Sequence, residues 1–487
     1  MVLTFAKFGY DGALVSVKVD VRNDIPAVDI VGLAAGAVRE FRERMKAALG
    51  ASGFAIDRRV LVSLSPADLR KEGANFDLPA CLAVAQVLQG KQQNIPVFSY
   101  GEVELSGKLR PVSGAYNALV KAREAGYRYA VMPKMIEKAP DGMRVFYADT
   151  LLEAYTAYLT ITGSEEIPEK EQEKMTVTFS GETTLDETKG HGRAKFAMAV
   201  AAAGRHNILA WGAPGCGKTM LLQRLPELTP DLLPEEKESV KRIYSIAGMP
   251  LDVCKQRPFR MPHQTASIEG MCGGGQRCSP GEILLSHNGT LFLDEAADFK
   301  SAVLQMLRVS VETHSITMSR AGRTTVYPAD FQLVMATNPC LCGNFGTKDK
   351  VCLCSGHAVE QYWRKFSAPL LDRVEIRISV EADDTERTLA DLREMIKTAW
   401  ETQLKRQGKL NARLSPHEIL AYCKLPEAAQ EKLDEWTREE DLSQRAVSNL
   451  LKVSRTVADM SGHENILLDD LITAGALHGK LPVENLL

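Results

Sequence analysis

The sequence predicts an α/β protein of several domains, in which a doubly wound parallel sheet occupies the middle of the chain. With 487 residues, the chain is too long for one hydrophobic core, and about three domains of roughly 150 residues are expected. Short apolar runs such as 207–211 and 290–293 alternate with helical patterns, which is typical of parallel strands covered by helices on both faces. From about residue 383 onward strand-like runs stop and amphipathic helices follow, which indicates a helical domain.

These patterns divide the chain into four segments. Residues 1–163 form a first α/β domain, because runs such as Val15–Val21 alternate apolar and polar residues with the period of a half-buried strand. Residues 164–182 form a linker, because their first part is rich in charge and has few large apolar residues. The sheet domain then spans 183–382, and the helical domain spans 383–487.

The composition excludes several classes of protein. Hydrophobic residues make up 45% of the chain and charged residues 25%, which rules out disorder as the main state. The formal net charge of -3 means that contact with nucleic acid requires a local basic patch. No apolar run approaches the roughly 18 residues that span a bilayer, and the first residues lack a secretory signal, so we expect a cytoplasmic protein without membrane contact. Ten cysteines are too sparse for a disulfide scaffold.

A phosphate-binding motif follows the apolar run 207–211. The pattern Gly-x-x-x-x-Gly-Lys-Thr lies between that run and a helical stretch, which is the context that the motif requires. Its glycines turn backbone N–H groups toward phosphate oxygens, Lys218 supplies positive charge to the β- and γ-phosphates, and the Thr219 hydroxyl suits Mg²⁺. The sequence therefore predicts a site for ATP and Mg²⁺ formed by Gly212, Ala213, Pro214, Gly215, Cys216, Gly217, Lys218 and Thr219.

Two further strand ends complete the predicted site. The run 290–293 is followed by Asp294, which would hold Mg²⁺, and by Glu295, which would polarise the attacking water. The next buried run, 333–338, ends at Asn338, whose amide would bind the γ-phosphate or orient the water. A capping role is the alternative for Asn338, and the order of the motifs favours the sensor role.

Two arginines are candidates for stabilising the charge of phosphoryl transfer. Arg373 follows a turn, and Arg445 lies on a predicted helix of the C-terminal domain. Guanidinium groups spread the developing charge, and one supplied from outside the site makes hydrolysis depend on assembly. A surface salt bridge is the alternative role of each arginine.

The order of these motifs resembles that of the AAA+ ATPases of the magnesium-chelatase-like YifB/ComM family. The resemblance covers nearly the whole chain and rests on Arg257–His263, Pro280–Ile283, Leu370–Arg373, Ile30–Leu33, Val38–Glu40, Pro66–Gly73 and Phe76–Pro79. It implies a P-loop AAA+ core and a C-terminal helical lid. The chain departs from the family pattern at Gln264, where a second His is usual, at Ala296-Ala297 in place of Leu-Pro, and at Gly192 in place of Gln. The departures leave the predicted ATP site intact.

The N-terminal domain resembles the S5-like proteolytic fold of Lon peptidases, whose chemistry needs a Ser nucleophile and a nearby Lys. The corresponding positions carry Asn75 and Tyr116. We therefore expect no peptidase activity, and a scaffold that assembles subunits or touches substrate.

Two segments of the sheet domain are candidates for contact with DNA. Residues 315–327 are two β-prone runs around an Ala-Gly turn and predict a hairpin, which resembles the pre-sensor-1 hairpin of related helicases. Arg320 and Arg323 would then face phosphates, whereas a hairpin braced by solvated arginines is the alternative. The Gly-rich insertion 268–278 carries Arg277 and could form a second pore loop or a plain flexible loop.

Four cysteines form a separate cluster after Asn338. The pairs Cys340-x-Cys342 and Cys352-x-Cys354 could complete a closed, structural Zn²⁺ site, with His357 as a spare ligand. Free, reduced cysteines are the alternative.

The resemblance implies a ring-forming, hexameric ATPase in which Arg373 of one subunit completes the ATP site of the next. Such a motor would drive its hairpins along single-stranded or branched DNA, as in branch migration or helicase activity during recombination or transformation. A chelatase motor that inserts Mg²⁺ into a porphyrin is one alternative, against which the Lon-like domain argues. A protein remodeller or regulator is another, for which an aromatic hairpin tip would be expected in place of Arg-Ala-Gly.

Overall fold

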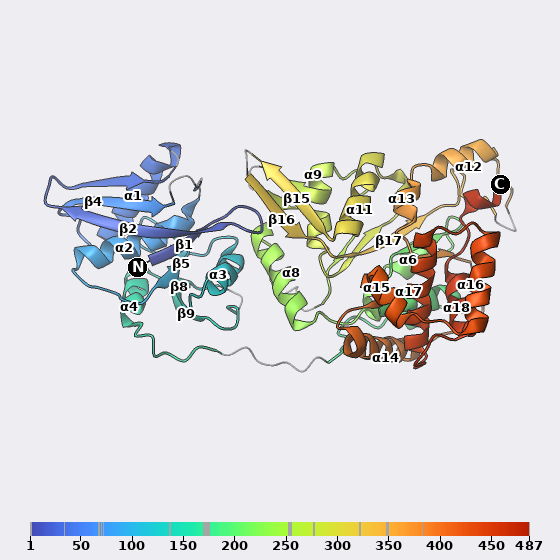
Figure 1. Cartoon of the computed structure of the whole chain (residues 1–487). Coiled ribbons are helices and arrows are strands. Elements are labelled where there is room, and N and C mark those ends of the chain that lie inside the picture. Colours follow the sequence, from blue (N-terminus) through green and yellow to red (C-terminus); the bar gives the residue numbers. More distant parts are fainter. Residues whose placement is uncertain are drawn as a thin grey trace.

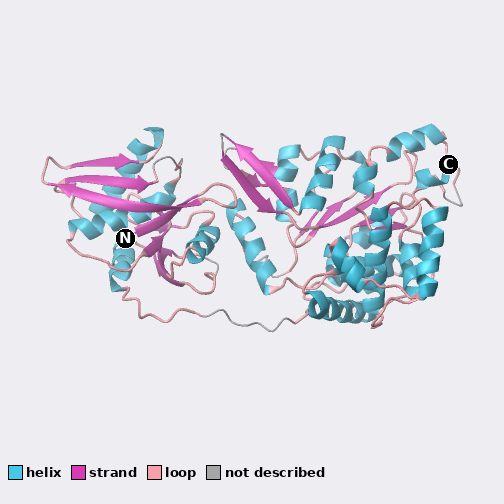
Figure 2. Cartoon of the chain, viewed as in Figure 1, coloured by secondary structure: helices cyan, strands magenta, loops and turns pink. Residues whose placement is uncertain are grey.

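The computed structural model describes residues 2–33, 35–66, 69, 71, 73–135, 138–168, 176–251, 256–275, 278–320, 323–346, 350–381 and 383–486. Three regions follow one another along the molecule, and the sheet domain lies between the N-terminal domain and the C-terminal helices (Figure 1). The architecture is the predicted mixture of α/β and helical parts (Figure 2).

The N-terminal domain is a mixed seven-stranded sheet in the order β3-β4-β2-β1-β5-β8-β9. Its strands are β1 (Val2–Ala6), β2 (Ala13–Arg22), β3 (Ala27–Val31), β4 (Arg59–Ser65), β5 (Val97–Ser99), β8 (Tyr129–Pro133) and β9 (Arg144–Ala148). Its helices are α1 (Ala35–Ala51), α2 (Asp77–Leu88), α3 (Ala115–Glu124) and α4 (Leu151–Thr160), and β6 (Glu102–Val103) pairs with β7 (Leu109–Arg110) in a small separate ladder. The predicted alternation holds in β2, where Val15 and Val17 are buried and Lys18 is exposed.

The middle domain is built on five parallel strands in the order β11-β14-β17-β10-β18. They are β10 (Ile208–Trp211), β11 (Phe259–Arg260), β14 (Thr290–Leu293), β17 (Gln332–Thr337) and β18 (Ile376–Ser379). Every residue of β10, β14 and β17 is buried, as expected of strands covered on both faces. Because all five strands are parallel, their carboxyl ends lie at the same edge of the sheet.

Helices and two small insertions surround this sheet. The helices are α5 (Gly192–Gly204), α6 (Lys218–Leu222), α7 (Leu225–Leu228), α8 (Pro234–Ala247), α10 (Glu282–Leu285), α11 (Ser301–Thr313), α12 (Gly356–Trp363) and α13 (Ala368–Leu371). One insertion consists of α9 (Ile268–Cys272), β12 (Gly273–Gly274) and β13 (Ser279–Pro280). The other is the predicted hairpin, formed by β15 (Ser315–Arg320) and β16 (Arg323–Pro328). The Ala-Gly turn between its strands lies outside the described residues.

The C-terminal region is helical and packs on α5. Its helices are α14 (Leu389–Gln407), α15 (Pro416–Tyr422), α16 (Glu427–Glu439), α17 (Gln444–Met460) and α18 (Leu468–Leu477). The alanines of α5 leave room for close approach, and the Trp400 indole donates to the Ala202 carbonyl at 3.1 Å. In the described part of the chain, no helix combines the length and apolarity needed to cross a bilayer.

Candidate nucleotide-binding site

The predicted phosphate-binding residues meet at the carboxyl edge of the five-stranded sheet. The loop Gly212–Gly217 follows β10, Asp294 and Glu295 follow β14, and Asn338 follows β17. Because β10, β17 and β14 are adjacent parallel strands, these segments lie side by side although up to 126 residues separate them along the chain.

Lys218 lies at the centre of this edge. Its ammonium donates to the carbonyl oxygens of Gly212 at 2.8 Å and Ala213 at 2.9 Å, and to Oδ1 of Asn338 at 3.3 Å. The side chain is therefore held among acceptors next to the loop that would bind phosphate. The contact with Asn338 joins the sensor residue to the loop, as expected if both groups address one phosphate.

Thr219 and Asp294 face each other across the site. Thr219 Oγ1 donates to Asp294 Oδ1 at 2.9 Å, and the same carboxylate oxygen accepts the backbone N–H of Glu295 at 3.1 Å. A hydroxyl beside a carboxylate is the oxygen donor set that Mg²⁺ takes when it is bound together with nucleotide phosphates. The residues present therefore fit Mg²⁺ with ATP.

Two glycines of the loop are required by its shape. Gly217 has a φ of 90°, in the left-handed region that favours glycine. A Cβ at Gly212 would lie 2.6 Å from the Val380 carbonyl oxygen, so the loop could not lie against the end of β18 with a side chain there.

The candidate general base has a neighbour to which the sequence analysis assigned no role. Glu295 has a φ of 49° and is exposed, and its carboxylate accepts a hydrogen bond from Nε2 of Gln264. Gln264 follows β11, the strand beside β14. The signal that could have found it is the departure from the family pattern at Gln264, four residues after the end of β11.

Arg373 and Arg445 do not lie near this edge. The Arg373 carbonyl accepts from Nδ2 of Asn207 at 2.8 Å, and Asn207 immediately precedes β10, at the opposite edge of the sheet from the phosphate-binding loop. Arg445 lies beside Arg373, because both guanidinium groups pair with the carboxylate of Glu312, Arg445 at 3.2 Å. The two arginines are thus brought together, and the backbone of Arg373 and the Lys218 ammonium lie at opposite ends of β10, whose four residues span about 13 Å at 3.3 Å per residue.

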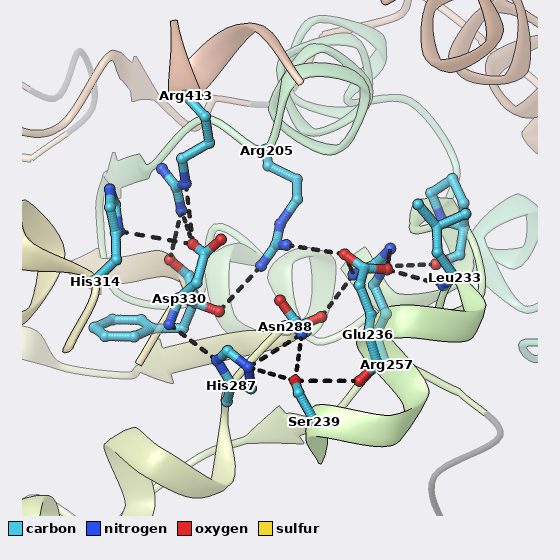
Figure 3. Close-up of polar contacts among 12 residues, drawn as sticks. Arg205, Leu233, Glu236, Ser239, Arg257, His287, Asn288, His314, Asp330 and Arg413 are labelled. Atoms are coloured by element: carbon cyan, nitrogen blue, oxygen red, sulfur yellow. Dashed lines mark hydrogen bonds and ion pairs between the residues drawn. The ribbon is translucent and has the colours of Figure 1, made fainter. Parts of the chain in front are cut away.

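A buried polar network supports that opposite edge (Figure 3). Asp330, just before β17, accepts from Nε of Arg413 at 3.0 Å, and its carbonyl accepts from Arg205 at 3.4 Å. His287 accepts the Asp330 N–H through Nδ1 at 3.1 Å and contacts the Ser239 hydroxyl through Nε2 at 2.7 Å. Because Arg413 belongs to the C-terminal helical region, the network fixes that region to the base of the sheet.

The hairpin lies against the N-terminal domain. The Arg323 guanidinium stacks on the Phe8 ring at 3.9 Å, and the backbone N–H of Tyr10 donates to Oγ1 of Thr325 at 3.1 Å. Arg320 is exposed, and Arg277 lies outside the described residues. Arg320 is therefore exposed to solvent, whereas Arg323 packs against Phe8 of the N-terminal domain.

The four clustered cysteines converge. Sγ of Cys340 lies 3.4 Å from that of Cys342 and 3.7 Å from that of Cys352, and the sulfur atoms of Cys342 and Cys352 are 3.6 Å apart. With Cys354 included, all four sulfur atoms lie within 4.8 Å of one another. Tetrahedral Zn–S bonds of about 2.3 Å place sulfur atoms about 3.8 Å apart, so the cluster has the dimensions of a zinc site. His357 instead contacts Gln361 at 2.9 Å.

The positions predicted to correspond to a peptidase dyad serve packing. Asn75 is buried and donates from Nδ2 to the Phe5 carbonyl at 2.9 Å. Tyr116 is also buried, and its backbone N–H donates to Oγ of Ser245 on α8 at 3.2 Å. Both residues therefore hold the N-terminal domain and its contact with the sheet domain in place.

A glycine-rich loop, two acids and an asparagine at the ends of adjacent parallel strands, followed by a helical domain, are the arrangement typical of AAA+ P-loop ATPases. Three family descriptions match the chain: "Magnesium chelatase, subunit ChlI" over residues 184–388, "Subunit ChlI of Mg-chelatase" over residues 17–136, and "Magnesium chelatase, subunit ChlI C-terminal" over residues 386–478.

Relatives match almost the full length. Competence protein ComM of Haemophilus influenzae is 36% identical over 97% of this chain and 96% of its own length. The uncharacterized protein YifB of Escherichia coli is 34% identical over 94% of this chain and 93% of its own length. DNA repair protein RadA of Escherichia coli is 31% identical over 84 residues, which are 17% of this chain and 18% of RadA. The chain belongs to the magnesium-chelatase-like YifB/ComM family of AAA+ ATPases.

Proposed function

We propose that this protein is a ring-forming motor that hydrolyses Mg-ATP and acts on DNA. The observation that carries the proposal is the division of the catalytic residues between two edges of one sheet. Lys218, Thr219, Asp294, Glu295 and Asn338 meet at the carboxyl edge, whereas Arg373 and Arg445 meet at the opposite edge. Each subunit would therefore carry its nucleotide site on one face and its two arginines on another.

The residues at the carboxyl edge supply the chemistry of hydrolysis. Lys218 and the backbone N–H groups of the loop would bind phosphate, while Thr219 and Asp294 would hold Mg²⁺, which would neutralise charge on the phosphates. Glu295 accepts a proton from the attacking water, and Asn338 orients that water or the γ-phosphate.

The arginines act between subunits. In a closed ring, the face that carries Arg373 and Arg445 meets the ATP site of the next subunit, where guanidinium groups stabilise the charge of the transition state. A head-to-tail contact of this kind closes into a ring when its rotation closes, and the family implies six subunits.

DNA is the proposed substrate. The full-length relative ComM is named a competence protein and the partial relative RadA a DNA repair protein. Arg320 is exposed on the hairpin and would contact phosphates without reading sequence. Branch migration or helicase activity on single-stranded or branched DNA, in recombination or transformation, is the function that we infer for a cytoplasmic motor of this kind. The Lon-like character of the N-terminal domain stays a prediction.

We also propose that Cys340, Cys342, Cys352 and Cys354 bind a structural Zn²⁺. Their sulfur atoms are too far apart for disulfides, which have an S–S length of about 2.05 Å, and suit tetrahedral thiolate coordination. Leu341, Val351 and Leu353 in the same loop are 68%, 79% and 88% exposed. Because these three apolar side chains contribute little burial, a metal crosslink would add to the ordering of this loop.

Steady-state ATP hydrolysis with single-stranded, duplex and branched DNA at low salt tests the proposed motor. Glu295→Gln should lower kcat at least about a hundredfold with nucleotide binding retained, and Lys218→Ala should abolish nucleotide binding.

Arg320→Ala should reduce the stimulation of turnover by DNA. It should also reduce the slope of DNA affinity against salt concentration by about the amount expected for one phosphate contact. Arg364→Ala, an exposed arginine paired with Glu360 on α12, is the matched control. Turnover that no DNA stimulates would instead favour a protein or chelatase-type partner.

A further inference from the structure

Glu312 is the shared partner of the two arginines at the edge opposite the ATP site. Its carboxylate pairs with Nη2 of Arg373 through one oxygen and with Nη2 of Arg445, at 3.2 Å, through the other. The hydrogen bond from Arg373 lowers the pKa of Glu312, so the carboxylate is charged at neutral pH. One anion therefore separates two guanidinium groups that would otherwise repel each other.

The position of Glu312 is not explained by the helix that carries it. Glu312 lies in the last turn of α11, where the helix dipole makes a negative side chain unfavourable. The pairing with the arginines offsets this cost. The ion pairs with Arg373 and Arg445 therefore explain the position of the Glu312 carboxylate.

Arg373 is covered while this contact exists. Its side chain is 8% exposed, compared with 46% for Arg445 and 47% for Glu312. The Arg373 guanidinium also donates from Nη1 to the Pro369 carbonyl, and among the described residues its buried Nε has no hydrogen-bond acceptor. An arginine that is to reach another molecule must leave Glu312 first, and its incompletely satisfied Nε lowers the cost of leaving.

The C-terminal helical region holds the two arginines beside each other. Asn449 on α17 donates from Nδ2 to the Asp372 carbonyl at 2.9 Å, one residue before Arg373. Arg445 lies one turn earlier on the same helix. Movement of α17 would therefore move both arginines relative to Glu312.

We infer that Glu312 holds Arg373 and Arg445 in a resting state and releases them to the nucleoside triphosphate bound by the neighbouring subunit. This inference rests on the proposed ring motor, and makes Glu312 a positioning residue. The triphosphate carries more negative charge than one carboxylate and offers oxygens suited to bidentate pairing, so it competes for the guanidinium groups. The equilibrium shifts because the triphosphate interacts only with the released arginines.

Release of the arginines from Glu312 would also change the position of the hairpin. Glu312 precedes the first residue of β15 by three positions, and Oγ1 of Thr313 donates to the Ser315 carbonyl at 3.0 Å between them. The end of α11 is therefore continuous with the strand that carries Arg320. Nucleotide in one subunit would in this way alter the hairpin of the next.

Glu312→Gln, which keeps the shape and removes the charge, tests the inference in the full-length protein. We expect the half-saturating ATP concentration for assembled turnover to fall about three- to tenfold with kcat within about twofold of wild type, because the competent fraction rises. Stimulation by DNA should fall, because the hairpin no longer depends on release. Glu435→Gln, which removes a carboxylate paired with Lys432 on α16, is the matched control.

The same change in an Arg373→Ala, Arg445→Ala background separates the outcomes. There Glu312→Gln should leave the half-saturating concentration unchanged, whereas a shift of equal size in both backgrounds would overturn the inference. A fall in kcat alone would also overturn it, as would normal wild-type turnover with no effect of Glu312→Gln. Absence of ATP turnover in the wild type would overturn the proposed motor together with this inference. Glu312→Asp, which restores the charge, should return the values toward wild type.

Discussion

His287 illustrates how a single buried residue couples the stability of the sheet domain to pH. Nδ1 accepts the Asp330 N–H at 3.1 Å, so Nε2 carries the proton that is shared with the Ser239 hydroxyl at 2.7 Å. Burial lowers the pKa of His287 to about 4 from 6.5. A second proton would have to occupy Nδ1 and would displace the Asp330 N–H, which gives the lowered pKa a structural reason.

Acidification should therefore destabilise the protein between pH 6.5 and about 4. The unfolded chain binds a proton at His287 below pH 6.5 while the folded chain does not until about pH 4, so stability is present above pH 6.5 and is lost as pH falls. By pH 5 the loss from this residue is about 2 kcal/mol. Thermal unfolding of wild type and His287→Gln at pH 7 and pH 5 measures it. The variant should be less stable at pH 7 but lose less on acidification, and an equal loss would contradict the assignment.

At the scale of single elements, the sequence predicted those features of the fold and of the site that are marked by a short local motif. Lys218, Thr219 and Asp294 were predictable because each lies at a strand end marked by its own motif, and parallel strands bring such ends together. The hairpin and the four cysteines were predictable because each is marked by a local pattern, the hairpin by two β-prone runs around a turn and the cysteines by two Cys-x-Cys pairs. Contacts between separate motifs were not, because packing in three dimensions brings them about: Gln264 meets Glu295 across 31 residues, and Glu312 meets Arg373 across 61.

The cysteine loop has one such contact with the proposed ATP site. Gly343, between the two cysteine pairs, has a φ of 78°, and a Cβ there would lie 2.5 Å from the ring of Pro214 in the phosphate-binding loop. The backbone of the cysteine loop thus rests directly on the nucleotide site. A metal that orders this loop would also support the loop that binds phosphate.

Cys340→Ser should therefore remove Zn²⁺ and weaken ATP binding together. We expect about one Zn²⁺ per wild-type chain by elemental analysis, little in the variant, and a several-fold higher half-saturating ATP concentration. Cys423→Ser changes a buried cysteine of the C-terminal region and should leave the metal content unchanged. Metal-free wild-type protein with free thiols and unaltered ATP binding would contradict the prediction.

At the scale of the whole molecule, the described residues of the N-terminal domain contact the sheet domain at α8 and at the hairpin. One is α8, where Arg123 pairs with Glu238 at 2.7 Å and the Gly114 N–H donates to the Ser245 carbonyl at 2.8 Å. The other is the hairpin, which Figure 1 shows facing the N-terminal domain beside α8. Because the hairpin is held by a second domain of the same chain, its movement requires either that this domain follows or that the contact opens.

The hairpin contact is specific in its chemistry. Asp11 accepts from Oγ1 of Thr325 at 3.1 Å and from the Val326 N–H at 3.3 Å, in addition to the stacking of Arg323 on Phe8. Gly9, with a φ of 54°, lies against Thr325 where a side chain would collide. The turn between β1 and β2 therefore fits one face of the hairpin, and fixes Arg323 in a position where its guanidinium face is covered.

Phe8→Ala should release Arg323 and strengthen binding to DNA. Without the ring, the guanidinium loses a cation–π contact of about 0.5–2 kcal/mol, so less free energy is needed to move it to a phosphate. Affinity for single-stranded DNA, measured by fluorescence anisotropy, should rise several-fold at low salt, and the salt slope should steepen by about 0.7 for one added phosphate contact. Phe179→Ala, which removes the ring that Arg393 contacts at 5.3 Å, is the control for loss of such a pair elsewhere. In a Phe8→Ala, Arg323→Ala double variant the gain should disappear, because it depends on that guanidinium. A gain that persists without Arg323 would mean that the N-terminal domain restrains another part of the hairpin, and weaker binding by Phe8→Ala would mean that the contact with the N-terminal domain holds the hairpin in its DNA-binding position.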